Sequence, residues 1–99
     1  MAAIIVVTAH YPRREDIPRL GACRSIRRVE SEYVWEGRVC TGEEWEVSFK
    51  CTHSQRARLV KAILASHPDE VPYVAWRAEM VTAAYARWAK RTPALESMQ

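Results

Sequence analysis

The sequence from Val29 to Cys51 has the two-residue alternation of a long β-hairpin, and no other pattern constrains the fold as strongly. From residue 45 the apolar residues share one face of a strand: Trp45, Val47, Phe49 and Cys51. The other face carries Glu44, Glu46, Ser48 and Lys50. The predicted turn is at Glu36 and Gly37, because Gly accepts the positive φ of a tight hairpin turn. Both arms are longer than the helices of so short a chain can cover, so we expect the hairpin to project and to join subunits.

The chain has 99 residues, which we expect to form one domain over residues 1–99 with a flexible tail at about 94–99. Its 48% hydrophobic and 27% charged residues are typical of globular proteins. The net charge of +3 is spread over 15 basic and 12 acidic residues. Because no basic ribbon with interleaved aromatic residues and no helix-turn-helix pattern accompanies that charge, nucleic-acid binding is not predicted.

The three cysteines, Cys23, Cys40 and Cys51, are odd in number and widely spaced. That usage favours free thiols in a reducing compartment over a disulfide framework or a zinc knuckle. The apolar start, residues 2–9, is too short to span a membrane and follows no basic residue, so it reads as a buried strand rather than a signal peptide. We therefore expect a cytoplasmic protein that does not enter a membrane.

The rest of the chain alternates between strand and helix patterns. Residues 3–9 are a continuous apolar run, typical of a central strand. Pro12 and Pro18 leave room for about two helical turns before a second strand begins near Gly21 or Ala22. After the hairpin we predict a helix that Thr52 or Ser54 caps and that stops before His67, and a strand at 71–78. A closing helix follows, with Thr82 as its predicted cap and Pro93 at its end.

This order predicts an α+β fold, namely a ferredoxin-like βαββαβ sandwich with a shortened first helix, a long central hairpin and a C-terminal helix. We expect the helices on one face of the sheet. The hairpin aromatics are then too many for two helices to cover: Tyr33, Trp35, Trp45 and Phe49. A bare aromatic face associates with other copies, so we expect a closed ring of subunits.

Several short motifs occur in one order along the chain. Residues 66–75 read Ser-His-Pro-Asp-Glu-Val-Pro-Tyr-Val-Ala, residues 33–37 read Tyr-Val-Trp-Glu-Gly and residues 84–88 read Ala-Tyr-Ala-Arg-Trp. Thr8, Ala9 and residues 50–52 (Lys-Cys-Thr) complete the set. Together they resemble the CutA divalent-cation tolerance family of PII-like ferredoxin-fold trimers, with its His-Pro-Tyr-Glu-Val-Pro and Tyr-x-Trp-Glu-Gly patterns. The resemblance covers nearly the whole chain, and it implies a tight homotrimer with hairpins exchanged between subunits.

The resemblance also implies a role in tolerance of divalent metal ions, copper among them. In a bacterial member the copper ligands are a cysteine before Thr-Ala-Pro and a His-His pair; here those positions are Val7, Ser66 and His67. His10 stands where the family has the proline of Thr-Ala-Pro. His67 and His10 are therefore our candidate ligands for Cu²⁺ or another divalent cation at a cleft between subunits. The alternatives are a His67 that donates to carbonyls at a helix end and a solvated His10.

Two further departures from the family concern the same region. The segment between Ala9 and Cys23 is shorter than the family's by about two helical turns, and Asp69 replaces the tyrosine after His-Pro. We also expect a pocket at the subunit interface. Its candidate lining residues are Lys50, Tyr33, Trp35, Glu36 and Glu70. The alternative for its charged members is a set of ordinary surface ion pairs.

Three functions remain open from the sequence. The first is a non-enzymatic, trimeric protein that binds divalent metal ions. The second is a PII-like regulator that binds a nucleotide or another small anionic ligand between subunits, where Lys50, Arg24 and Arg28 meet phosphates. The third is an enzyme that uses the trimer seam, with Glu36 or Glu70 as base and Tyr33 or Tyr73 as its partner. It is the least favoured, because no nucleophile and base set, paired carboxylates or phosphate loop is found.

Overall fold

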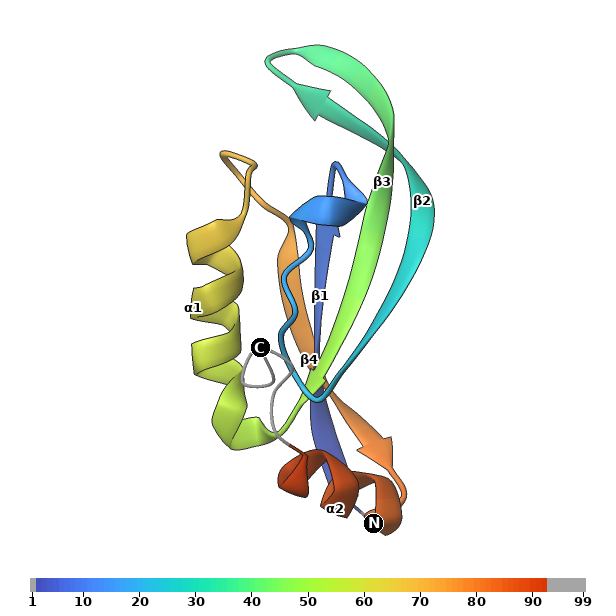
Figure 1. The fold of residues 1–99 in the computed structure, drawn as a ribbon. Coiled ribbons are helices and arrows are strands. Elements are labelled where there is room, and N and C mark those ends of the chain that lie inside the picture. The colour runs from blue at the N-terminus through green and yellow to red at the C-terminus, as the bar shows by residue number, and fades with distance from the viewer. Residues whose placement is uncertain (1, 93–99) are drawn as a thin grey trace.

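The computed structural model describes residues 2–92 and shows an antiparallel four-stranded sheet flanked by helices (Figure 1). The strands are β1 (Ala2–Tyr11), β2 (Cys23–Trp35), β3 (Arg38–Cys51) and β4 (Val74–Val81). The helices are the 3₁₀ turns η1 (Arg14–Asp16) and η2 (His53–Gln55), α1 (Arg56–Ser66) and α2 (Ala83–Arg91). The sheet order β2-β3-β1-β4 is that of a ferredoxin-like α+β fold, as predicted. The predicted tail at 94–99 lies outside the described residues.

Strand β1 is the centre of the fold. It pairs with β3 on one side and β4 on the other, and Ile4, Ile5, Val6 and Val7 are all at most 7% exposed. Successive side chains of a strand point to opposite faces, so a continuous apolar run requires cover on both. The prediction of a central strand buried on both faces is confirmed.

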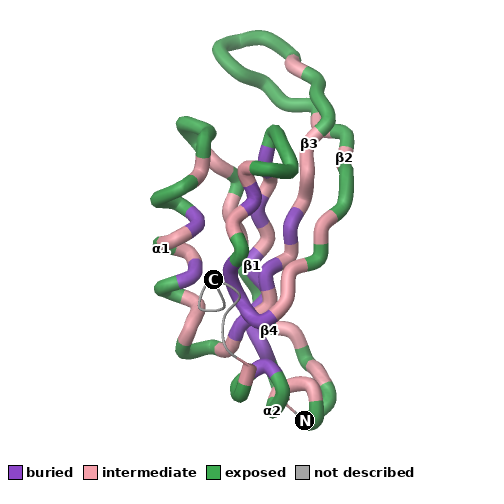
Figure 2. The backbone as a smooth tube through the Cα atoms, in the orientation of Figure 1, coloured by how far each residue is buried: buried purple, intermediate pink, exposed green. Residues whose placement is uncertain are grey.

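The hairpin extends well past the rest of the sheet. Pairing between β1 and β3 ends at Tyr11 opposite Trp45, whereas β2 and β3 stay paired up to Trp35 opposite Arg38. The turn has positive φ at both central residues, 51° at Glu36 and 77° at Gly37. From residue 38 to residue 44 the hairpin is therefore a two-stranded ribbon, and Figures 1 and 2 show its exposed end projecting beyond the sheet.

The connection between β1 and β2 contains one 3₁₀ turn, η1, in place of the expected shortened α-helix. Pro18 follows η1 within two residues and prevents its continuation as a helix. The extended remainder is fixed to β2, because the Arg24 guanidinium donates to the carbonyl oxygens of Ile17 (3.2 Å) and Pro18 (3.3 Å). A short, side-chain-fixed connection thus replaces the first helix of the ferredoxin-like plan.

The two helices pack on opposite faces of the sheet, so the expectation that both cover one face is wrong. On α1, Leu59 and Ile63 belong to the same core cluster as Val7. On α2, Ala89 packs instead with Ile4 and Val6, which point the other way. The continuous apolar run of β1 makes this arrangement necessary, because a single helical layer would leave the second face of β1 in water.

The distribution of aromatic residues also differs from the expectation. Phe49 is fully buried and Trp45 half-buried on the face that α1 covers, so neither belongs to a bare sheet face. The exposed aromatic residues lie instead on the hairpin end, just before and within β4, and on α2: Tyr33, Trp35, Tyr73, Trp76 and Trp88. Exposed aromatic surface is therefore divided between the end of the hairpin and other parts of the molecule, Trp88 on α2 among them.

Strand β4 begins at Val74, three residues after the predicted start at Val71. Pro72 lacks a backbone N–H and cannot contribute to the ladder, so residues 67–73 remain a loop between α1 and β4. At the end of β4 the Thr82 side chain accepts a hydrogen bond from the Tyr85 N–H and caps α2, as predicted. Of the residues on α2, Trp88 is 40% exposed and Ala89 is the buried one.

Phe49→Ala should lower the free energy of unfolding by about 3–5 kcal/mol, because it leaves a cavity between α1 and the sheet. Leu64→Ala on α1 is the control, since Leu64 is 51% exposed, and it should change stability by less than about 0.5 kcal/mol. Urea unfolding at one protomer concentration measures both. Equal effects would contradict the assignment of Phe49 to the core.

Candidate functional site

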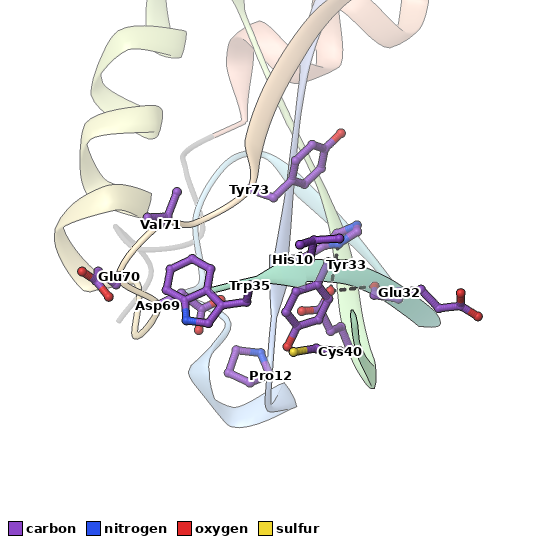
Figure 3. Close-up of a pocket in the computed structure, with 13 residues that line it drawn as sticks. His10, Pro12, Glu32, Tyr33, Trp35, Cys40, Asp69, Glu70, Val71 and Tyr73 are labelled. Atoms are coloured by element: carbon purple, nitrogen blue, oxygen red, sulfur yellow. Dashed lines mark hydrogen bonds and ion pairs between the residues drawn. The ribbon is translucent and has the colours of Figure 1, made fainter. Parts of the chain in front are cut away.

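A pocket of about 630 Å³ lies between the projecting hairpin and the loop that joins α1 to β4 (Figure 3). The hairpin contributes Ser31, Glu32, Tyr33, Val34, Trp35, Cys40 and Glu44. The loop contributes Asp69, Glu70, Val71 and Tyr73, and the end of β1 contributes His10 and Pro12. The volume is in the range of small-molecule sites. The pocket exists because the hairpin extends past the point where β1 ends.

The lining of this pocket is acidic and aromatic. Four carboxylates line it: Glu32, Glu44, Asp69 and Glu70. Three aromatic rings accompany them, those of Tyr33, Trp35 and Tyr73, and each is roughly half exposed. The described lining includes no lysine or arginine. The local potential is therefore negative, which attracts cations and repels phosphates.

His10 is held between two carboxylates of β3. Its Nδ1 is 3.1 Å from Glu44 Oε2 and its Nε2 is 2.8 Å from Glu46 Oε2. Both contacts are hydrogen bonds at once only when both ring nitrogens carry a proton, which makes the ring cationic. The ring also lies against Tyr73, with 4.8 Å between centroids. Sheet register produces the contact, since His10 stands directly opposite Glu46.

Glu46 links His10 to the outer strand of the hairpin. Its second oxygen accepts from Arg27 Nε at 2.8 Å and lies 2.7 Å from Arg27 Nη2. Hydrogen bonding from His10 and then from Arg27 lowers the pKa of Glu46, against an opposing effect of partial burial. Glu44 likewise accepts from the Ser31 hydroxyl at 2.8 Å. These contacts make one polar network across β1, β3 and β2.

His67 lies behind the pocket wall, with a fully buried side chain. Its Nε2 donates to the His10 carbonyl oxygen at 2.7 Å, and its Nδ1 accepts from the Asp69 N–H at 3.1 Å. The ring stacks on Tyr11 at 4.4 Å between centroids. Both nitrogens thus have hydrogen-bond partners, and a metal ion would bind His67 only after one of these bonds is broken.

Tyr11 forms the floor beneath His67. It is fully buried, and its hydroxyl has no hydrogen-bond partner among the residues that the structure describes. Burial raises the pKa of Tyr11 to about 12, so the phenol is neutral at physiological pH. The stacked pair of Tyr11 and His67 fixes the loop after α1 to the end of β1.

The remaining predicted pocket residues do not all meet. Tyr33, Trp35 and Glu70 line the pocket together with His10. Glu36 is in the turn of the hairpin and is not part of the lining. Lys50 is farther down β3, where its Nζ donates to Ser25 Oγ at 2.9 Å.

Sequence reasoning did not single out Glu44 and Glu46, which bond to His10, or Ser31, which bonds to Glu44. Their alternation along the hairpin already placed Glu44 and Glu46 on one face. The missing information was the register of β1 against β3, which pairs residues about 35 positions apart. Tyr73 and Cys40 were likewise brought to the pocket by the tertiary fold.

Comparison with known families settles the relationship of this chain. The family model described as CutA1 divalent ion tolerance protein matches residues 17–92, which include the hairpin, both helices and β4. This chain belongs to the CutA1 family. The matched range begins inside the connection between β1 and β2, so β1 and η1 lie outside the part that the CutA1 model matches.

Named relatives agree with the CutA1 assignment. The chain is 35% identical over 83 residues to the divalent-cation tolerance protein CutA of Thermococcus kodakarensis, covering 76% of this chain and 80% of that protein. The crystal structure of CutA1 from Oryza sativa matches with a TM-score of 0.79 and 29% identity, over 90% of this chain and 92% of that one. The structure of CutA from Synechococcus elongatus has the same fold, with a TM-score of 0.83 and 23% identity, over 91% and 89% of the two chains.

The arrangement of possible metal ligands bears on what this CutA1 chain can bind. Within residues 2–92, no three His, Cys, Asp or Glu side chains are arranged so that they could hold a metal ion. A metal ion that used the pocket of this CutA1 chain would therefore need donors beyond those that one described chain brings together.

None of the described helices is both long enough and apolar enough to cross a membrane.

Glu46→Gln should weaken the loss of stability in acid. A carboxylate whose pKa is lowered by folding stabilises the fold above its ordinary pKa of 4.5, and that stabilisation is lost as the pH falls through the folded value. Urea unfolding across the acidic range should therefore show a shallower pH dependence for Glu46→Gln than for the wild type. Parallel curves would show that the contacts with His10 and Arg27 contribute nothing.

Proposed function

We propose that this protein is a non-enzymatic, homotrimeric member of the CutA1 family that binds divalent metal ions, Cu²⁺ among them, at the pocket beside His10. The observation that carries the proposal is the grouping of an imidazole, the Cys40 side chain and four carboxylates around one pocket. Nitrogen, sulfur and oxygen donors together suit borderline ions such as Cu²⁺ and Zn²⁺. Membership of a family described by divalent ion tolerance supports the same conclusion.

The proposed metal site is completed by a neighbouring subunit. One chain offers donors without a three-ligand cluster among its described residues, so a second chain has to supply the rest. Of the two proposed histidine ligands, His10 lines the pocket and would exchange Glu44 for the ion. His67 bonds to the His10 carbonyl, and we propose that it mainly holds that segment in place.

The contacts favour a cation over an anionic ligand. Lys50, proposed to meet phosphates, bonds to Ser25 and does not line the pocket. Arg28 pairs with Glu43, and Arg24 binds two carbonyl oxygens of the connection before β2. A nucleotide in the pocket would face four carboxylates, and the described lining sets against them only His10, which is already bonded to Glu44 and Glu46.

The exposed end of the hairpin supports the proposed homotrimer. Val34 and Val39 are paired across the ribbon and are 70% and 75% exposed. An apolar pair in water at the end of a projecting ribbon is stabilised by covering it with another copy. We also propose a cytoplasmic location, because Cys23, Cys40 and Cys51 are all free thiols.

His10→Gln should weaken Cu²⁺ binding by at least roughly tenfold. Removing a residue that only supports a metal ligand already lowers metal affinity by about that factor, and His10 is proposed to be a ligand itself. Isothermal titration of the metal-free protein measures the affinity. His53→Gln is the matched control, because His53 is exposed in η2 and lies outside the pocket. Equal Cu²⁺ affinity of the wild type and His10→Gln would refute the site.

The same titration with His67→Gln separates the two histidines. If His67 only supports the His10 segment, Cu²⁺ affinity should fall less than in His10→Gln while thermal stability falls more. A larger loss of Cu²⁺ affinity in His67→Gln would make His67 the principal ligand.

Val39→Asp should dissociate the trimer, because it places a charge in the surface that neighbouring copies cover. Light scattering at micromolar concentration should give three chains for the wild type and fewer for the variant. Val39 does not line the pocket, so the change tests assembly alone. A wild-type monomer at that concentration would remove the basis for a shared site.

A further inference from the structure

The geometry of the pocket points to a second class of ligand, and we propose that it binds an organic ammonium ion, a positively charged alkylamine with an apolar stem. This inference goes beyond the proposed metal binding and does not depend on it. It rests on two properties of one pocket: three aromatic rings on its walls and an excess of carboxylates around them.

The aromatic part of the argument concerns Tyr33, Trp35 and Tyr73. Tyr33 and Trp35 reach the pocket from the end of β2, and Tyr73 reaches it from the loop before β4 (Figure 3). All three are between 43% and 53% exposed in a single chain, so their rings are not packed in its hydrophobic core. Aromatic faces attract ammonium groups through the ring quadrupole, and several rings around one space are the usual receptor for alkylated ammonium ions.

The charge of the pocket has the matching sign. Against its four carboxylates stands only the His10 imidazole, and no lysine or arginine belongs to the described lining. His10 is moreover already bonded to Glu44 and Glu46. Within residues 2–92, Glu32 and Glu70 form no ion pair. These two carboxylates are available to a ligand without breaking an existing contact.

The combination distinguishes an organic cation from a bare metal ion. A metal ion binds a compact set of donors, which the described residues of one chain do not form. A pocket of about 630 Å³ with aromatic walls instead suits a bulky, weakly hydrated cation whose stem contacts the rings. Ionic and cation–π contacts then act on the same ligand from different sides.

Isothermal titration at low salt with three probes tests the inference: choline, spermidine and the uncharged carbon analogue of choline. We expect one of the two ammonium probes to bind and the uncharged analogue not to bind. Tighter binding of choline identifies a compact methylated ammonium, and tighter binding of spermidine identifies an extended polyamine. Absence of binding by both, or equal binding of the uncharged analogue, would overturn the inference.

Substitutions place the ligand. Trp35→Leu keeps an apolar side chain but removes the ring, and it should weaken ammonium binding by about 2- to 30-fold. Trp76→Leu is the matched control, because Trp76 is 50% exposed and lies outside the pocket. Tyr73→Leu repeats the test from outside the hairpin, in case Trp35→Leu disturbs assembly. Identical affinities in Trp35→Leu, Tyr73→Leu and Trp76→Leu would exclude the pocket.

A Cu²⁺ titration of the same samples keeps the two proposals apart. Ammonium binding without Cu²⁺ binding supports this inference and counts against the proposed metal function. Cu²⁺ binding without ammonium binding supports the proposed metal function and overturns this inference.

Discussion

The antiparallel pairing of β1 with β3 is the interaction on which the rest of the structure depends. Its register places Val7 opposite Phe49 in the core that α1 covers, and on the other face it places His10 opposite Glu46. A shift by one residue would move every one of these side chains to the wrong face. The hydrophobic core and the polar network around His10 are therefore set by one register, and neither can change alone.

The pocket follows from where that pairing stops. After Tyr11 the chain leaves the sheet, while the hairpin continues as a ribbon and lies over the loop after α1. His67 fixes that loop to the end of β1 through the His10 carbonyl and the Asp69 N–H. The space between ribbon and loop is thus bounded by segments held from both sides. Its acidic lining determines the sign of the ligand, and its aromatic residues offer contact to a ligand's apolar part.

The sequence predicts the parts of this structure that depend on local rules. The two-residue period locates the hairpin, Gly37 marks the turn and Thr82 caps α2, because each follows from neighbouring residues. The sequence does not predict on which side of the sheet α2 packs. Ile4 and Val6 have to be covered by other residues, but their pattern does not identify the helix that covers them. The hydrogen-bond partners of His10 were not predicted either, because they depend on the register between strands that are distant in the sequence. Of the predicted pocket residues, Tyr33, Trp35 and Glu70 meet, whereas Glu36 and Lys50 do not line the pocket.

Strand β2 is an outer strand of the sheet along its whole length, and one of its edges has no neighbour among the described strands. Such an edge can recruit extended segments of other chains into unlimited stacks. Here the strand carries Arg24, Arg27, Arg28, Glu30 and Glu32, and like charges of adjacent copies would repel in such a stack. Protection against amyloid-like growth is thereby built into the element that reaches furthest from the core, and only its last residues are left apolar enough for contact with a chosen neighbour.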